Sequence, residues 1–308
     1  MRVGVIGVGE MGQNHVRIYH ELGAEIVGIS DIDEKRATSI SRQYGTMVFP
    51  DYTELLNQDL DAVSIVVPTT IHHEVALRAI ARGVNMLVEK PLADTIAYGK
   101  EMVEAAEKAG LKLMVGHIER FNPAVQKLKQ ILDDDILGEL ISMTARRVGP
   151  FVPRVNDTGI IVDVATHDID IIRYLAGREC TSISARSIGR KNMKGDAALI
   201  LLGFGELGFG DMLSASVEVN WHTPHKVRTL TVTGTKGIAY LDYIKQEIEI
   251  YTAEWKMVPK VDKEEPLKME IQHFIGCIER DEQPLVSGQD GLRVLEIAIQ
   301  AEECANKI

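Results

Sequence analysis

The sequence predicts an α/β protein with two domains: a doubly wound parallel sheet in residues 1–118, and an α+β domain with a mostly antiparallel sheet in residues 119–308. In the first part, short apolar runs alternate with helical segments, which is typical of a parallel sheet. In the second part, strand-like segments follow one another without helices between them, which favours antiparallel pairing. A chain of 308 residues is long enough for two domains of ordinary size.

The first domain is expected to begin with a strand and then to alternate. Its predicted strands cover residues 3–6, 26–29, 62–67, 85–88 and 112–115. Its predicted helices cover residues 11–22, 33–44, 70–82 and 93–109. Gly83 and Gly110 follow two of these helices, where a left-handed residue commonly ends a helix. Because crossovers between parallel strands are nearly always right-handed, these segments should form a doubly wound sheet.

The second domain is expected to place its helices at its two ends and its strands between them. The predicted helices cover residues 122–134, 159–176, 267–279 and 289–305, with Asp157 or Thr158 as the N-cap of the second helix. The predicted strands cover residues 181–188, 197–202, 208–219, 228–232, 238–241 and 247–251. Gly234-Thr-Lys-Gly237 is a hairpin signal between two of these strands.

Composition narrows the class of partner. The formal net charge is −11, which disfavours non-specific binding to nucleic acid or to an anionic membrane. The three cysteines have neither zinc-site spacing nor the even number of a disulfide framework, so no metal site is expected. No signal peptide is expected, because Met1 and Arg2 lead directly into the first predicted strand, and no apolar run approaches the ~20 residues of a membrane helix. A cytoplasmic protein is therefore expected.

A glycine-rich turn between the first strand and the first helix predicts a dinucleotide site. The first glycine of Gly-x-Gly-x-x-Gly makes the tight turn, the second lets pyrophosphate approach, and the third lets helix and strand pack closely. The N–H groups and the dipole at the helix N-terminus favour the anion. The expected cofactor-binding residues of this turn are Gly7, Gly9, Glu10, Met11 and Gly12.

Asp31, at the end of the second predicted strand, lies where an acidic residue binds the adenosine ribose hydroxyls. Its carboxylate would repel a 2′-phosphate, so NAD is expected rather than NADP. Lys35 and Arg36 follow closely enough to pair with such a phosphate, which keeps NADP open. The alternative is that Asp31 only caps the next helix, although Asp33 suits that cap equally well.

Two more strand ends carry candidate residues, and the carboxyl ends of strands are where ligands bind in open α/β sheets. Pro68 and Thr69 end one strand and His72 begins the helix after it; alone, they would read as a turn and a surface histidine. Glu89 and Lys90 follow the strand at 85–88, so the lysine is a candidate to act on a substrate oxygen.

Asp163 and His167 lie four residues apart on a predicted helix, and so on one face of it. Histidine exchanges a proton near neutral pH, and a neighbouring carboxylate can fix its tautomer. The alternative is an ion pair on the helix surface, extended by Asp168 and Asp170. Oxidation of a secondary alcohol needs NAD, a base and a group that steadies the alkoxide, and these residues fit that set.

Taken in order, these motifs closely resemble one family. The sequence resembles the glucose–fructose oxidoreductase / inositol dehydrogenase / rhizopine-catabolism (Gfo/Idh/MocA) family over essentially the whole chain. The motifs that carry the resemblance are the glycine turn, Pro68-Thr69 with His72, Glu89-Lys90-Pro91, Gly116-His117 before Arg120-Phe121-Asn122-Pro123, and Asp163-x-x-x-His167. The resemblance implies a Rossmann domain and a second domain whose large, mostly antiparallel sheet commonly forms the dimer interface, often within a tetramer.

The resemblance also implies that Lys90 and His167 flank the reacting hydroxyl and that Asp163 assists; which of the first two is the formal base stays open. Lys90–Pro91 is a candidate for a cis bond, since X–Pro tolerates cis at low cost. Many relatives have a run of glycines before the Asp-x-x-x-His helix, whereas here Asp157-Thr158 precede a single Gly159, so the substrate contacts of that loop are not carried over.

Within the family, the segments around Arg120 and Trp221 are most like members of the UDP-N-acetylglucosamine 3-dehydrogenase type. Diphosphate, carboxylate or uracil recognition is then expected from Arg120, Asn122, Arg154 and Trp221. The alternatives are that Trp221 packs on the sheet and that Arg120 forms an interdomain ion pair.

Two other functions remain open at this point. One is a dehydrogenase of free sugars, inositol or a small diol. The other is a regulator that binds NAD without turnover, since a fold alone does not fix a function. The presence of Lys90, Asp163 and His167 together argues against the regulator.

Overall fold

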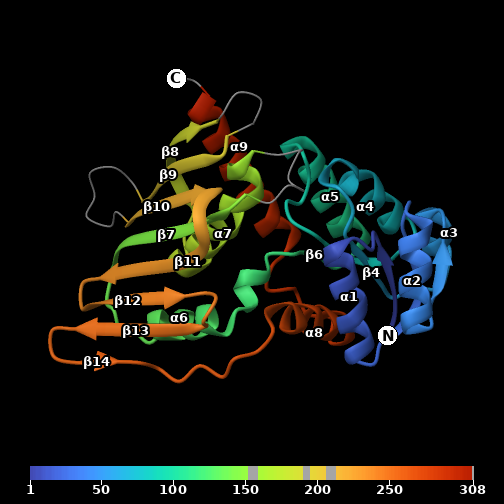
Figure 1. The fold of residues 1–308 in the computed structure, drawn as a ribbon, viewed down its shortest axis with the longest axis horizontal. Helices are drawn as coiled ribbons and strands as arrows, with labels where there is room; N and C mark the ends of the chain where they lie inside the picture. The colour runs from blue at the N-terminus through green and yellow to red at the C-terminus, as the bar shows by residue number, and fades with distance from the viewer. Residues whose placement is uncertain (152–158, 190–194, 206–212, 307–308) are drawn as a thin grey trace. The chain divides into compact units, whose positions relative to one another are not determined.

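The computed structural model describes residues 1–151, 159–189, 195–205 and 213–306. They form two compact units, Met1–His117 with Leu267–Leu295, and Ile118–Pro266 with Glu296–Ile308 (Figure 1). Residues 267–295 were expected in the second domain, but in the structure they belong to the first unit. Leu292 and Leu295 lie against Gly99 of the first unit, and Lys112 pairs with Asp281 at 2.7 Å, so apolar packing and an ion pair hold this segment there.

The first unit contains the expected parallel sheet, with strand order β3-β2-β1-β4-β5-β6. Its strands are β1 (Arg2–Ile6), β2 (Glu25–Ser30), β3 (Met47–Phe49), β4 (Ala62–Ile65), β5 (Asn85–Val88) and β6 (Leu113–Val115). The residues of β4 are all buried, as expected for a strand of a sheet that helices cover on both faces. The strand order reverses between β1 and β4, and this switch point is where ligands bind in such folds.

The helices of the first unit are α1 (Glu10–Glu21), α2 (Glu34–Tyr44), α3 (Tyr52–Leu56), α4 (His72–Ala81) after η1 (Thr69–Ile71), α5 (Ile96–Ala109), α8 (Pro266–Glu279) and the first part of α9 (Gly288–Asn306). Asp33 caps α2 by accepting a hydrogen bond from the Arg36 N–H at 3.0 Å. Gly83 and Gly110 have φ of 72° and 67° at the ends of α4 and α5, as expected. No helix in the described ranges is both long and apolar enough to cross a membrane.

The second unit contains one mixed, mostly antiparallel sheet of order β14-β13-β12-β11-β7-β10-β9-β8. Its strands are β7 (Leu140–Pro150), β8 (Cys180–Ile188), β9 (Ala197–Phe204), β10 (Leu213–Asn220), β11 (His222–Gly234), β12 (Gly237–Asp242), β13 (Glu247–Thr252) and β14 (Lys256–Met257). The hairpin at 234–237 joins β11 to β12, as expected. β7 and β10 pair in parallel, and the other neighbours are antiparallel.

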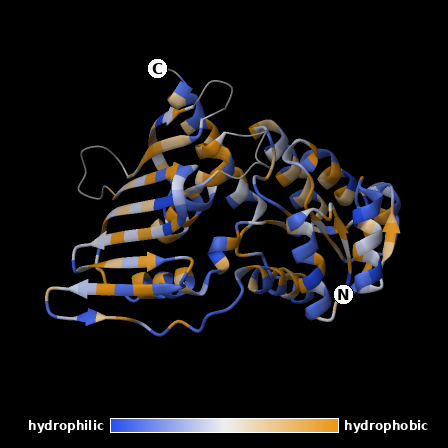
Figure 2. Cartoon of the chain, viewed as in Figure 1, coloured by the Kyte–Doolittle hydropathy of each residue, from blue (hydrophilic) through white to orange (hydrophobic). Residues whose placement is uncertain are grey.

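Helices cover one face of this sheet. α6 (Pro123–Asp133) packs on β12 and β13, and α7 (Thr166–Ala176) packs on β7 and β10. Figure 2 shows hydrophobic and hydrophilic residues alternating along these strands, which is the pattern of a sheet with one buried face. The structure differs from the single helix expected at 159–176: a π-helical turn, η3 (Ile161–Ala165), precedes α7. The expected N-caps of that helix, Asp157 and Thr158, lie outside the described residues.

Candidate functional site

The glycine turn between β1 and α1 has the geometry of a pyrophosphate site. Gly7 has φ +87°, and a Cβ there would collide with the carbonyl oxygen of Val66. A Cβ on Gly12 would collide with the carbonyl oxygen of Gly7. At Gly9, by contrast, a Cβ would meet nothing within 4 Å. Two glycines are therefore required by packing, and the third leaves open space beside the N-terminus of α1, which fits a dinucleotide phosphate.

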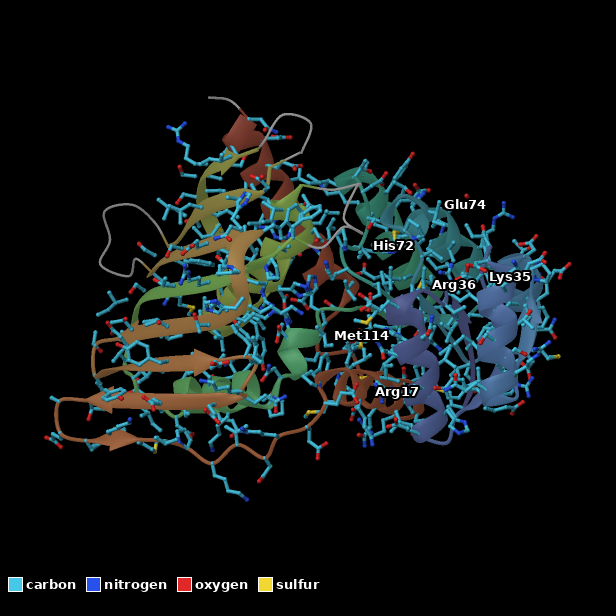
Figure 3. The ribbon with its side chains drawn as sticks, in the orientation of Figure 1. Arg17, Lys35, Arg36, His72, Glu74 and Met114 are labelled. Atoms are coloured by element: carbon cyan, nitrogen blue, oxygen red, sulfur yellow. The ribbon has the colours of Figure 1, made fainter. Side chains whose placement is uncertain are left out.

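Asp31 ties the end of β2 to this turn. Its carboxylate accepts hydrogen bonds from the N–H of Val8 at 2.7 Å and of Asp33 at 2.8 Å, and it pairs with Arg36 at 3.0 Å. Although partial burial raises the pKa of Asp31, the Arg36 and backbone hydrogen bonds lower it overall, so the carboxylate is charged. Lys35 and Arg36 both lie on α2 (Figure 3). Because Asp33 caps α2, Asp31 is not needed for that cap.

His72 is buried rather than exposed, and its side chain links two loops. One ring nitrogen lies 2.9 Å from the Val67 carbonyl oxygen and the other 3.0 Å from the Pro91 carbonyl oxygen. Burial lowers the pKa of His72, although both carbonyl groups oppose this effect. The ring thus joins the loop that contains Pro68 and Thr69 to the loop after β5.

A buried hydrogen-bond chain ends at Lys90. The Lys90 N–H donates to one carboxylate oxygen of Glu89 at 3.2 Å, and the other oxygen lies 3.2 Å from His15 Nε2. His15 Nδ1 lies 3.0 Å from the Ser64 hydroxyl, which lies 2.9 Å from the Tyr19 hydroxyl. The bond between Lys90 and Pro91 is cis. Glu89 and Lys90 were predicted from the sequence, but His15, Ser64 and Tyr19 were not.

Glu89 is held as an ion by this chain. Burial raises the pKa of Glu89, but the hydrogen bond from His15 and the positive charge of Lys90 lower it below its usual 4.5. Gly116 leaves the room that the carboxylate needs, since a Cβ there would lie 3.1 Å from it. A negative group therefore stands at the carboxyl end of β5, beside the candidate catalytic lysine.

In the second unit, Asp163 lies in the π-helical turn and His167 in the first turn of α7, and both are half-buried. A π-turn adds a residue to the helical ladder, so the two side chains are spaced differently from a regular i, i+4 pair. Such turns are frequent at functional sites.

The side chains of Arg120 and Asn122 form hydrogen bonds within the second unit. The Arg120 guanidinium makes hydrogen bonds of 2.6–3.0 Å to Asp170 and lies 5.1 Å from the centre of the Tyr174 ring. The Asn122 side chain caps α6 and donates to the Tyr243 carbonyl oxygen at 3.1 Å. Both residues thus stabilise the fold. Arg154 lies outside the described residues.

Trp221 lines a cavity of about 400 Å³ instead of being buried in the sheet. Its ring meets Phe151 edge to face, with the ring centres 5.7 Å apart. His222 lines the same cavity and pairs with the buried Asp196 at 3.0 Å. The cavity therefore offers an aromatic wall together with polar groups, which suits a ring-shaped ligand.

The described second unit also contains a buried charge cluster that was not predicted from the sequence. Arg147 of β7 pairs with Asp168 at 2.7 Å and with Glu119 at 2.9 Å. Arg228 of β11 lies 3.9 Å from the same Glu119 carboxylate. No group of His, Cys, Asp and Glu among the described residues is arranged to hold a metal.

Two family models match the chain. Residues 1–117 match an oxidoreductase family with an NAD-binding Rossmann fold, and residues 125–240 match the GFO/IDH/MocA C-terminal domain. A relative named UDP-N-acetylglucosamine 3-dehydrogenase, from Acidithiobacillus ferrooxidans, is 30% identical over 97% of this chain and 96% of its own length. This chain belongs to the Gfo/Idh/MocA oxidoreductase family.

Other similarities agree with this assignment. A scyllo-inositol 2-dehydrogenase (NAD⁺) of Bacillus subtilis is 29% identical over 98% of this chain and 93% of that protein. A solved structure of the Acidithiobacillus ferrooxidans UDP-N-acetylglucosamine 3-dehydrogenase superposes with a TM-score of 0.91 at 28% identity, covering 99% of this chain and 97% of that one. The protein is thus an NAD-dependent dehydrogenase with the expected Rossmann and mostly antiparallel sheets.

Proposed function

We propose that this protein oxidises a ring hydroxyl of a UDP-linked amino sugar and transfers the hydride to NAD. The observation that carries this proposal is the 30% identity to the UDP-N-acetylglucosamine 3-dehydrogenase over 97% of the chain. The aromatic cavity beside Trp221 supports it, since a uracil base or a sugar ring packs well against aromatic side chains.

The proposed cofactor contacts come from the first unit. The open space at Gly9 would take the pyrophosphate, together with the backbone of Gly7, Glu10, Met11 and Gly12. Asp31 would hold the ribose hydroxyls, which favours NAD over NADP. Pro68, Thr69 and Glu89 would line the cofactor, and His72 would brace that loop through Val67 and Pro91.

The proposed chemistry is assigned to Lys90, His167 and Asp163. When bound, NAD accepts the hydride from the carbon that bears the reacting hydroxyl. The Lys90 ammonium would donate a hydrogen bond to the hydroxyl oxygen and steady its developing negative charge. The His167 imidazole would take the hydroxyl proton and pass it to water, and Asp163 would orient that imidazole. The alcohol thus loses one hydride and one proton, and a ketone remains.

The proposed assembly is a cytoplasmic homodimer or homotetramer formed through the face of the second unit's sheet that lies opposite α6 and α7. Strand register places Leu201, Ser216, Thr144, Thr231 and Tyr240 in one row across that face. Leu201 and Tyr240 are exposed in the single chain, and burying such a surface against a second copy is a common use of an apolar patch.

A second candidate is an inositol or free-sugar dehydrogenase, which the similarity to scyllo-inositol 2-dehydrogenase favours. The test is a panel of UDP-N-acetylglucosamine, UDP-glucose, scyllo-inositol and glucose, each followed by NADH absorbance with NAD and then NADP. We expect the highest kcat/KM with UDP-N-acetylglucosamine and NAD. Turnover of scyllo-inositol with none of UDP-N-acetylglucosamine would overturn the proposal and support the second candidate.

A further inference from the structure

A cavity of about 360 Å³ opens in the second unit, near the start of β11. This volume falls within the range of small-molecule sites in proteins. Its lining comes from η2 (Ile118–Phe121), the following Asn122, β11, the segment after β12 and Pro266 at the start of α8. The lining residues that matter here are Ile118, Glu119, Lys226, Arg228, Ile244 and Pro266.

Glu119 lines the cavity, and its negative charge is already compensated by Arg147, which is not part of the lining. Glu119 accepts hydrogen bonds from Arg147 at 2.9 Å and from the Asn122 amide at 3.2 Å. Arg147 also holds Asp168 at 2.7 Å, so one buried guanidinium serves two buried carboxylates. Glu119 therefore has little remaining capacity to bind another cation tightly.

Arg228 and Lys226 add positive charge on the cavity side. Within the described ranges, the carboxylate nearest to the Arg228 guanidinium is that of Glu119, at 3.9 Å, beyond hydrogen-bond distance. Burial and the positive charge of Arg147 lower the pKa of Arg228, although the carboxylates of Glu119 and Asp168 oppose this effect. Lys226 is exposed, and the described part of the chain pairs no acidic side chain with it.

The cluster as a whole thus carries three cationic side chains against two carboxylates: Arg147, Arg228 and Lys226 against Glu119 and Asp168. The excess lies on the two cations that line the cavity. Two adjacent cations match a ligand with more than one negative oxygen, and arginine and lysine are the side chains that usually bind phosphate. A lone carboxylate would compensate only one of them.

We propose that this cavity binds a phosphate or diphosphate group, with Arg228 and Lys226 as its cationic ligands. The occupant that we assign is the diphosphate of the nucleotide-linked sugar, and this assignment rests on the proposed function. An inorganic phosphate compound offers the same chemistry, and the experiment below separates the two sources. The apolar side chains of Ile118, Ile244 and Pro266 border the anion site and leave room for the organic part of such a ligand.

The test is calorimetric titration of UDP, inorganic pyrophosphate and uridine into the whole protein saturated with NAD, so that the glycine turn is already occupied. We expect UDP and pyrophosphate to bind and uridine to bind at least about tenfold more weakly than UDP, because the phosphate charge supplies the attraction. Arg228→Gln and Lys226→Gln should each weaken UDP binding by about tenfold, and Arg228→Lys should keep part of it.

The matched control is Lys236→Gln, an exposed lysine of the same unit that does not line the cavity. It removes the same charge and should leave UDP binding unchanged. Arg228 is half-buried, so circular dichroism of each variant shows whether it is folded. If Arg228→Gln does not fold, the exposed Lys226→Gln carries the test.

UDP binding tighter than pyrophosphate binding would assign a nucleotide-linked ligand, and the reverse would assign free phosphate compounds at the same site. Three results would overturn the proposal. The first is that uridine binds as tightly as UDP, and the second is that UDP binding is unchanged in Lys226→Gln and in folded Arg228→Gln. The third is that no phosphate compound binds. These outcomes do not depend on turnover. If a UDP-sugar yields NADH but the cavity variants bind UDP as the wild type does, only the assignment of the cavity is refuted. If phosphate compounds bind in the cavity but no sugar is oxidised, only the proposed function is refuted.

Discussion

His15 Nε2 lies 3.2 Å from a Glu89 carboxylate oxygen, and this contact joins the core of the first unit to the residue before Lys90. An ionised carboxylate can only accept, so Nε2 carries the proton and donates it. The other Glu89 oxygen accepts from the Lys90 N–H at 3.2 Å. The position of the Lys90 backbone therefore depends on a fully buried histidine of α1.

His15→Ala should lower both stability and turnover. The Glu89 carboxylate would lose its buried donor, which costs about 1–3 kcal/mol of unfolding free energy. Because burial raises the pKa of Glu89 and His15 lowers it, that pKa should rise in the variant. The acid limb of the kcat profile should then move to higher pH, which steady-state kinetics across pH would show.

His15→Gln keeps an N–H that can donate to Glu89 and should recover part of both losses. His20→Ala, an exposed histidine of the same helix, should change stability by less than about 0.5 kcal/mol. If His15→Ala matched the wild type in both urea unfolding and pH profile, the Glu89 contact would have no role.

Gly9→Ala and Gly12→Ala should fail in different ways. A Cβ at Gly9 meets open space, so the variant should fold normally but bind NAD about tenfold or more weakly, because the methyl group enters the pyrophosphate position. A Cβ at Gly12 collides with the Gly7 backbone, so this variant should lose stability. Thermal melts with and without NAD measure both effects. Equal NAD affinity in Gly9→Ala and wild type would contradict the assigned site.

Asp31→Ser should shift cofactor choice toward NADP. It removes the carboxylate that would repel a 2′-phosphate and releases the Arg36 guanidinium, now 3.0 Å from it. The ratio of kcat/KM for NAD over NADP should fall by about tenfold or more, equivalent to about 1.4 kcal/mol. Asp33→Ser keeps a good N-cap on α2 and should leave the ratio near that of the wild type. The opposite ranking of these two variants would refute the role given to Asp31.

Stability should depend on pH through His72. Burial lowers the pKa of His72 in the folded chain below 6.5, so the unfolded chain takes the proton first. Stability from this residue is therefore complete above about pH 6.5 and is lost as the pH falls toward the folded pKa. Relative to His72→Gln, the wild type should show an extra slope of at most about 1.4 kcal/mol per pH unit in urea unfolding. The exposed His225→Gln should keep the wild-type slope, and identical slopes in all three would disprove the argument.

The parts of the fold that depend on local pattern were predictable. Residues 85–88 form β5 as expected, and the paired glycines at 234 and 237 join β11 to β12. β7 was missed because Arg147, which pairs with Glu119 and Asp168, stands on its buried face and breaks the apolar alternation. β3 and α3 were missed because each is only a few residues long.

The candidate residues that belong to sequence motifs were predicted, but the residues that form hydrogen bonds with them were not. Sequence spacing gave no sign that Glu89 contacts His15, or that Arg120 is held by Asp170, since these pairs are 74 and 50 residues apart. One signal was available: His15 is a polar residue among the buried positions Val16, Ile18 and Tyr19 of α1. A histidine on a buried face needs partners, and that requirement could have directed attention to it.

The measurement that tests the central claim most directly is the appearance of NADH when NAD-saturated protein is mixed rapidly with UDP-N-acetylglucosamine. The wild type should form NADH, and Lys90→Met and His167→Ala should each slow that phase by about a hundredfold or more while still binding NAD. NADH formation within a few-fold of wild type in either variant would contradict the role of that residue. No NADH from any sugar, with NAD bound, would show that the protein binds NAD without catalysing this reaction.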